Sequence, residues 1–340
     1  MKEILSQIVE GKTLSEETAY EAMNEIMQGN VTTGQLMSML SVIRHRGETV
    51  EEMTGFVRAM RANMTKLAIK DDSIVDTCGT GGDGSSTFNI STAVSIILAA
   101  MGVKVAKHGN RKVSSKSGSA DVLEKLGIPI DTTPEQGARA LNEKGMTFMF
   151  APNYHQAMKH AGPARQELGF RTVFNLLGPM SNPANAKRQL IGIYDTAYAE
   201  KMAETLSKLG SKHVLLATGR DGLDEITMTG VTDIVELKDG QITRFTLTPE
   251  DVGLPSGSLE DIQIRTSEDS AEIIQQVIKG EANQSAMTIV IMNAAAGLYI
   301  SGKANDLKEG VSLVQEAIHN GSVQQYFTSI QEIKERRQYA

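Results

Sequence analysis

The first 65 residues place their apolar side chains at helical spacing. Residues 36–43, for example, carry apolar side chains three or four positions apart, as one face of a helix requires. A Thr precedes a Glu or Gln by three positions, a helix-start signal, at Thr13–Glu16, Thr32–Gln35 and Thr49–Glu52. Gly29 and Gly47 stand where helices would end. These short helices cannot bury their apolar faces alone, so they need each other, another part of the chain or a second subunit.

From about residue 72 the pattern changes to short apolar runs that alternate with helical segments. The predicted strands begin at 74–75 and recur at 103–106, 147–151, 189–193 and 214–217. The predicted helices start at Ser91 and recur at 120–126, 133–144 and 197–209. This alternation is typical of a mostly parallel central sheet with helices on both faces. Residues 234–247 read as a hairpin that turns at Asp239-Gly240, and the chain beyond about 270 is again mainly helical.

Residues 162–183 interrupt the alternation with helical pieces that end at Pro179 and Pro183. We expect this segment to pack on the N-terminal helices. The prediction is therefore an α/β protein with a small, discontinuous N-terminal helical domain (1–68 with about 162–185). The larger α/β domain would comprise 69–161 and 186–340.

Composition narrows the possible classes of protein. The 340 residues suggest about two domains. The net charge of −7 and the 4% aromatic content disfavour a nucleic-acid binder, so any phosphate chemistry needs a local basic pocket. A single Cys excludes an internal disulfide framework and fits a reducing compartment. With neither a signal peptide nor a membrane-spanning run recognisable, we expect a cytoplasmic protein without a membrane partner.

The first chemical motif is a stretch over 78–92 with four glycines and several hydroxyls, which follows a predicted strand and opens a helix. Glycines let backbone N–H groups approach an anion, and a helix N-terminus adds further donors. The stretch lacks the Lys of a P-loop, and Gly79-x-Gly81-x-x-Gly84 alone is a weak dinucleotide signal. A turn without a ligand is the alternative, but the combination of Gly, Ser and Thr favours a phosphate cradle.

The second motif spans 107–119 and places four Lys or Arg residues and one His within ten positions. It also follows a predicted strand and precedes a helix, with Ser119 as the expected N-cap. Two such loops in a parallel sheet meet at the edge where these sheets bind ligands. A solvated basic surface is the alternative, although the interleaved Gly and Ser residues favour an anion-binding loop.

Two further stretches are candidate binding sites mainly because the two predicted phosphate-binding loops precede them in the chain. Asp224-Glu225 follows a predicted strand, and such a pair suits Mg²⁺, which takes few carboxylates together with water and phosphate oxygens. Alone, it reads as an acidic turn. Residues 175–183, preceded by Arg165, could form a pocket for a flat acid or a rigid hinge between domains.

With these motifs in view, the chain resembles the anthranilate phosphoribosyltransferases, within the nucleoside-phosphorylase and phosphoribosyltransferase superfamily. These enzymes of tryptophan biosynthesis join the amine of anthranilate to phosphoribosyl pyrophosphate (PRPP), giving N-(5-phosphoribosyl)anthranilate and pyrophosphate. The resemblance rests on 76–92, 107–127, 153–183 and 220–225 and runs across nearly the whole chain. Lys112, which lies inside the second motif, and Val231 depart from residues common in the family, and the resemblance assigns neither of them a role.

The resemblance implies a role for individual residues. PRPP would be bound by Gly79, Gly82, Asp83, Thr87, Asn89, Ile90, Ser91, Thr92, Lys107, Ser115 and Ser119. Anthranilate would contact Gly79, His108, Asn110, Pro152, Arg165 and Gly178, with its carboxylate on Arg165. Mg²⁺ would be held by Ser91, Asp224 and Glu225. The resemblance also implies a homodimer formed through the small domain.

The residue types agree with this chemistry. Breaking the C1–O bond of the ribose places negative charge on the leaving pyrophosphate, which cations and N–H donors stabilise. The aromatic amine is already neutral, so no separate general base is needed, and the sequence shows no obvious candidate. A nucleoside phosphorylase is the nearest alternative function, although phosphate needs no Mg²⁺ pair. A non-catalytic or nucleic-acid-binding relative is the alternative from another class.

Overall fold

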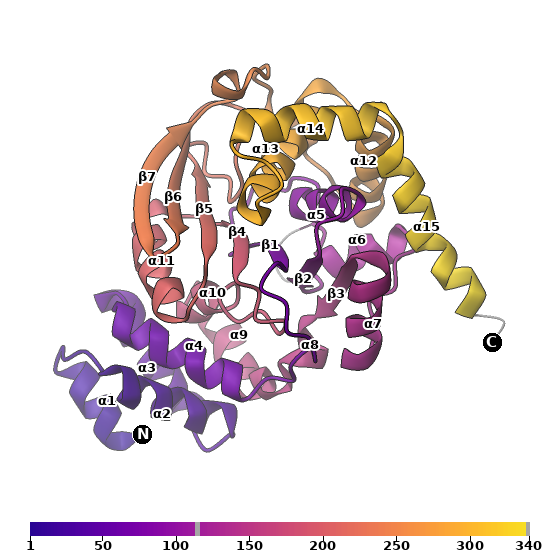
Figure 1. Cartoon of the computed structure of the whole chain (residues 1–340). Coiled ribbons are helices and arrows are strands. Elements are labelled where there is room, and N and C mark those ends of the chain that lie inside the picture. Colours follow the sequence, from indigo (N-terminus) through magenta and orange to yellow (C-terminus); the bar gives the residue numbers. More distant parts are fainter. Residues whose placement is uncertain (113–115, 338–340) are drawn as a thin grey trace.

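The computed structural model describes residues 1–112 and 116–337 and begins with four helices that pack together (Figure 1). They are α1 (Lys2–Val9), α2 (Glu16–Met27), α3 (Thr33–Arg46) and α4 (Val50–Ala62). Thr32 and Thr49 cap α3 and α4 with reciprocal capping boxes, as predicted. The expected cap at Thr13 is wrong, because Ser15 is the residue that accepts the Thr18 N–H at the start of α2.

A seven-stranded sheet in the order β3-β2-β1-β4-β5-β6-β7 forms the centre of the larger part. Its strands are β1 (Val75–Gly79), β2 (Val105–Gly109), β3 (Met146–Phe150), β4 (Arg188–Gly192), β5 (His213–Gly219), β6 (Thr232–Lys238) and β7 (Gln241–Leu247). The first five are parallel, and β6 and β7 add the predicted antiparallel hairpin. The predicted mostly parallel sheet is confirmed, with strand limits shifted by one to three residues.

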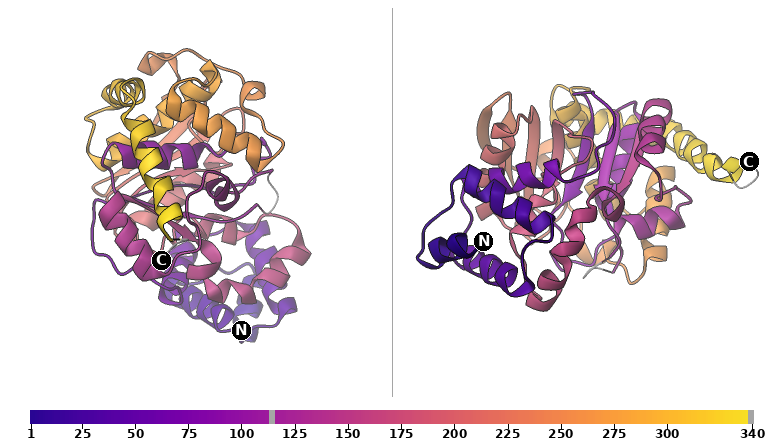
Figure 2. Two further views of the ribbon diagram at one scale, coloured as in Figure 1. Left: turned by 90° about the vertical axis from the view of Figure 1, so that its right-hand side faces the viewer. Right: turned by 90° about the horizontal axis from the view of Figure 1, so that it is seen from below.

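Helices cover both faces of this sheet (Figure 2). Side chains that alternate along β5 show the two layers: Leu215 joins one apolar core, whereas Val214 and Leu216 join the other. The first core contains α5 (Ile90–Ala100), α6 (Ser119–Lys125), α12 (Ser267–Lys279), α13 (Gln284–Ser301), α14 (Leu307–His319) and α15 (Ser322–Arg337). The second contains α11 (Ala199–Lys208) and the four N-terminal helices. A smaller core involves α7 (Pro134–Lys144) and α8 (Ala151–Tyr154).

The segment that interrupted the alternation forms α9 (Gly162–Leu168) and α10 (Val173–Leu177), after a 3₁₀ turn η1 (Gln156–His160). Helix α9 packs on α3, and α10 packs on α3 and α4. Arg61 of α4 also donates two hydrogen bonds to the carbonyl of Met180, at 2.7 and 3.0 Å. These contacts agree with the expected discontinuous helical domain, whose exact limits stay a prediction.

Three 3₁₀ turns complete the elements: η2 (Thr196–Tyr198), η3 (Glu250–Val252) and η4 (Leu259–Ile262). The last two lie on the connection from β7 to α12. Across residues 1–112 and 116–337, no helix is both long and apolar enough to cross a membrane.

Candidate active site

The three predicted loops meet at one edge of the sheet. The Gly81 N–H donates to Asp224 Oδ2 at 2.7 Å, which joins the loop after β1 to the loop after β5. Lys107 Nζ donates to Ser91 Oγ at 3.1 Å, and the Asn89 side-chain amide donates to the Ser117 carbonyl at 3.3 Å. The basic stretch therefore contacts the start of α5. The parallel neighbours β2, β1, β4 and β5 bring these loops together because their carboxyl ends share an edge.

Close approach by Asp224 explains two glycines of this edge. A Cβ on Gly79 would lie 2.6 Å from Asp224 Oδ2, and a Cβ on Gly192 would lie 1.5 Å from the Asp224 carbonyl oxygen. Neither position tolerates a side chain while the Asp224 loop stays in place. The Gly-rich loop after β1 thus leaves room for the Asp224 carboxylate. That carboxylate comes from the loop after β5, a strand two positions from β1 in the sheet.

A distant part of the chain anchors the other end of the Gly-rich loop. The Asn89 N–H donates to Ser270 Oγ at 3.0 Å, and the Ser270 hydroxyl donates back to Asn89 Oδ1 at 2.8 Å. The Phe88 N–H donates to the Ile262 carbonyl at 3.1 Å, and Thr87 forms an isolated bridge with Gln263. Because Asn89 is the N-cap of α5, these bonds fix where that helix begins.

Burial and neighbouring carboxylates at the loop edge disfavour the charged forms of Asp224 and Glu225. Burial, followed by the charge of Asp83, raises the pKa of Asp224 to about 7. Burial and the charge of Asp224 raise the pKa of Glu225 well above its usual value, although the Ser91 N–H and Lys107 oppose this shift. Within residues 1–112 and 116–337, no group of three or more His, Cys, Asp or Glu residues forms a ready metal cluster. A cation that binds beside Asp224 and Glu225 would relieve their repulsion.

Lys107 lies buried on β2, and its side chain reaches β1 and the start of α5. Its Nζ donates to the Thr77 carbonyl at 2.5 Å as well as to Ser91. Burial lowers the pKa of Lys107, and the charge of Asp76 opposes that effect. Asp76 in turn accepts the His108 N–H at 3.2 Å. Asp76 is a positioning residue that sequence reasoning did not assign, although an acid inside an apolar strand was a usable signal.

A pair of neutral histidines lies beside this edge. The rings of His108 and His155 are 4.9 Å apart between centroids. Burial lowers the pKa of His108 to about 3 and that of His155 to about 4, so both imidazoles are neutral near pH 7. The Nε2 atoms of both rings are buried and have no hydrogen-bond partner among the described residues. His155 was not predicted, and only its place near 153–183 hinted at it.

The remaining expected anthranilate residues come from several elements. Arg165 lies on α9 with its guanidinium carbon 5.4 Å from the centroid of the Phe174 ring. Burial lowers its pKa, and no ion pair or side-chain hydrogen bond joins it to another described residue. Gly178 ends α10, Pro152 lies exposed on α8, and Asn110 follows β2.

The expected N-cap at Ser119 is wrong: Gly118 is the cap residue of α6, and its N–H donates to Asp121 Oδ2 at 3.1 Å. Asp121 at the N3 position thus supplies one half of a capping box, while Gly118 has no side chain to accept an N–H of the first turn. The Ser119 hydroxyl instead donates to the Asn110 carbonyl at 3.2 Å. Ser115 lies outside the described residues.

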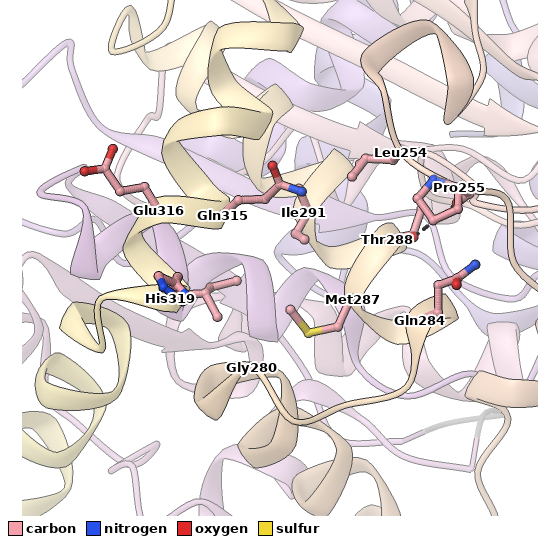
Figure 3. A pocket seen from close by; sticks show the side chains of 11 residues that line it. Leu254, Pro255, Gly280, Gln284, Met287, Thr288, Ile291, Gln315, Glu316 and His319 are labelled. Atoms are coloured by element: carbon pink, nitrogen blue, oxygen red, sulfur yellow. Dashed lines mark hydrogen bonds between the residues drawn. The ribbon is translucent and has the colours of Figure 1, made fainter.

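A separate groove lies between α13 and α14 and has a volume of about 670 Å³ (Figure 3). Met287, Ile291 and Leu254 give it an apolar lining, with Glu316 and His319 as its titratable residues. It contains none of the residues predicted to bind substrate or metal. The sheet edge, which gathers charged groups and glycines, is therefore the candidate active site.

Comparison with known proteins agrees with this location. Residues 71–324 match the glycosyl transferase family, α/β domain, and residues 2–64 match the glycosyl transferase family, helical bundle domain. The anthranilate phosphoribosyltransferase of Geobacillus kaustophilus is 58% identical over 318 residues, which cover 94% of each chain. That of Geobacillus sp. strain WCH70 is 57% identical and covers 100% of this chain and 99% of its own.

Solved structures show the same fold. Anthranilate phosphoribosyltransferase from Thermus thermophilus superposes with a TM-score of 0.92 at 38% identity, covering 97% of this chain and 99% of its own. The Saccharomyces cerevisiae enzyme in complex with PRPP and Mg superposes with a TM-score of 0.88 at 24% identity, covering 98% and 97%. The second likeness shows the fold alone. Together the comparisons favour the family of the sequence resemblance over the nucleoside phosphorylases.

Proposed function

The chain belongs to the anthranilate phosphoribosyltransferase family of glycosyl transferases, and we propose that it transfers the phosphoribosyl group of PRPP to anthranilate. The products would be N-(5-phosphoribosyl)anthranilate and pyrophosphate. One observation carries the proposal: the Gly-rich loop, the basic stretch and the Asp224-Glu225 pair contact one another at one sheet edge. An activated sugar diphosphate needs those three features in one place.

The donor would lie along the Gly-rich loop and the start of α5. Backbone N–H groups of the loop and of the first helical turn favour phosphate oxygens because they carry partial positive charge. Lys107 Nζ reaches Ser91 and would add a further donor to a phosphate oxygen there. The donor-binding set we propose is Gly79, Gly82, Asp83, Thr87, Asn89, Ile90, Ser91, Thr92, Lys107, Ser115 and Ser119.

We propose that Ser91, Asp224 and Glu225 hold Mg²⁺. The fit is electrostatic, since burial and mutual repulsion raise the pKa values of both carboxyls and a divalent cation reverses that cost. When bound, the cation would neutralise the developing charge of the pyrophosphate. The Gly81 N–H holds Asp224 in place, and the Ser91 N–H holds Glu225.

Anthranilate would bind on the α9 and α10 side of the edge. The Arg165 guanidinium, which has no carboxylate partner in the described chain, would receive the anthranilate carboxylate. His108, Asn110, Pro152, Gly178 and Gly79 would line the ring and amine. His108 and His155 are neutral, so neither would place a positive charge beside the amine. The lone pair of the amine would therefore stay available to attack C1. Orientation and leaving-group stabilisation would supply the catalysis.

The direct test mixes the purified protein with anthranilate, PRPP and Mg²⁺ and follows the loss of anthranilate fluorescence. We expect fluorescence to fall only when all three are present, and pyrophosphate to appear in equal amount. Thymidine or uridine with phosphate serves as the control for nucleoside phosphorylase activity. Cleavage of those nucleosides without anthranilate consumption would contradict the proposal.

The family resemblance further supports two proposals on the protein's setting: a homodimer, and a place in the cytoplasm. Sedimentation of the purified protein tests the first. A monomeric mass at enzyme-assay concentration would contradict it.

A further inference from the structure

Arg171 is a cation of the sheet edge to which sequence reasoning assigned no role. It lies between α9 and α10, and its guanidinium carbon is 4.0 Å from the centroid of the Tyr194 ring. The Tyr194 backbone N–H donates to Thr80 Oγ1 at 3.2 Å, so the backbone that carries the ring is joined to the Gly-rich loop. The stacked guanidinium is thereby held in a fixed plane beside that loop.

The guanidinium touches the loop itself. A Cβ placed on Gly82 would lie 3.0 Å from Arg171 Nε and 3.4 Å from Nη2. Gly82 also has a φ of +79°, which disfavours any other residue. The backbone of Gly82 therefore runs directly against the guanidinium, next to Asp83.

Comparison with the other stacked arginines shows what is unusual. Arg58 lies over Tyr20 and pairs with Glu16, and Arg111 lies over Phe150 and pairs with Asp121 and Glu124. In the described part of the chain, no ion pair or side-chain hydrogen bond is found for Arg165 or Arg171, which are also stacked. A planar group with five N–H donors and no acceptor is suited to an external oxyanion.

The identity of that oxyanion follows from position. Arg165 is the cation proposed for the anthranilate carboxylate. Arg171 instead adjoins Gly82, one residue from the Gly81 N–H that contacts Asp224, where the Mg²⁺ is proposed. The anion that has to lie between the loop and the cation site is the diphosphate of the donor.

We propose that Arg171 binds the leaving diphosphate of PRPP and that Tyr194 positions it for this contact. The inference rests on the proposed function and adds to it a guanidinium held beside Gly82. Because the leaving group gains charge as the C1–O bond breaks, Arg171 would act on both donor binding and turnover.

The test measures binding of pyrophosphate with Mg²⁺ by calorimetry, without anthranilate. Arg171→Gln is expected to weaken pyrophosphate binding about 10- to 100-fold, the usual effect of losing a charged hydrogen bond. Arg171→Lys should recover part of the loss, because it keeps the charge but not the flat stack. In turnover, Arg171→Gln should raise the KM for PRPP and lower kcat, with the KM for anthranilate unchanged.

Two further variants separate binding from folding. Tyr194→Phe keeps the ring and should bind pyrophosphate as the parent does, whereas Tyr194→Ala should weaken binding. Arg58→Gln removes a stacked arginine that is paired elsewhere and should leave binding unchanged. Thermal unfolding of each variant confirms that it is folded.

Unchanged pyrophosphate binding in folded Arg171→Gln would overturn the inference, as would a rise in the anthranilate KM alone. The proposed function fails by a different result, namely a parent protein that binds pyrophosphate but does not consume anthranilate.

Discussion

Two carboxylate sites, one buried in the helical bundle and one half-buried at the sheet edge, differ in whether the protein itself supplies their hydrogen-bond donors and charge partners. Glu52 of α4 has 0% exposure and accepts the Leu14 N–H at 2.9 Å, the Thr49 N–H at 3.0 Å and Arg46 Nη2 at 2.7 Å. At the sheet edge, burial and neighbouring carboxylates instead raise the pKa values of Asp224 and Glu225.

This difference helps to distinguish charged side chains that stabilise the fold from those that bind a ligand. A carboxylate with all its donors in the chain holds helices together. Carboxylates whose charged form the chain disfavours are expected to bind a ligand from solution, here a cation. Arginines follow the same rule, since Arg46 is paired with Glu52 and Arg165 has no such partner in the described chain.

The largest expected effect comes from neutralising the sheet-edge pair. Asp224→Asn with Glu225→Gln removes two charged contacts of about 1.5–3 kcal/mol each, so kcat/KM for PRPP should fall at least about 100-fold. The Mg²⁺ concentration needed for half-maximal rate should rise, and steady-state rates over a Mg²⁺ series measure both. Metal-free stability should not fall, because the variant removes repulsion. Parental Mg²⁺ dependence would count against the metal assignment.

Removing the Glu52 carboxylate should lower stability and leave substrate binding unchanged. Glu52→Ala leaves the Arg46 charge and two backbone N–H groups without their acceptor, which should cost about 3–5 kcal/mol of unfolding free energy. Denaturant titration measures the loss. Glu51→Ala, on the exposed side of α4, is the control and should change stability little. The KM values of folded Glu52→Ala should match the parent, and a selective rise in one of them would break the comparison.

The Arg165→Ala variant tests whether an arginine without an ion-pair partner in the described chain binds a substrate carboxylate. Arg165→Ala should raise the KM for anthranilate by about one to two decades, because a charged hydrogen bond is worth about 1.5–3 kcal/mol. The KM for PRPP should change much less. Initial rates with each substrate varied in turn separate the two, and an unchanged anthranilate KM would remove Arg165 from this role.

The smallest expected effect is a pH slope in the metal-free protein. The folded state raises the pKa of Asp224 from 3.8 to about 7, so the native protein holds this proton more tightly than the unfolded chain does. The resulting stability is full below about pH 4 and is lost as pH rises through about 7. We expect a loss of about 1–2 kcal/mol between pH 5 and 8, reduced by solvent screening. Denaturation in EDTA at both pH values measures it, and Asp224→Asn should flatten the slope.

Local signals predicted much of the architecture. Thr32 and Thr49 cap their helices because both partners of a capping box lie three residues apart in sequence. The same signal at Thr13 was wrong, since Ser15 offered a competing cap two residues later. Alternating strands and helices predicted the parallel sheet, and therefore the shared edge of the loops.

Sequence could not reveal contacts that depend on tertiary placement. Arg171 belongs to no recognisable sequence motif. Its proposed role follows from its contacts with the Tyr194 ring and with Gly82. His155 can be assigned to the site only because its ring contacts that of His108. Gly192 lies in a strand pattern, and only the Asp224 carbonyl above it explains why no side chain fits.

The bond between Asn89 and Ser270 joins positions 181 residues apart and has a consequence for synthesis of the chain. A ribosome releases residue 89 long before residue 270, so the nascent polypeptide carries its Gly-rich motif without the hydroxyl that fixes it. Competence to bind the sugar diphosphate is therefore acquired late in translation. A fragment that stops before residue 262 would contain every charged motif and still lack the contacts with Ile262, Gln263 and Ser270 that hold the start of α5.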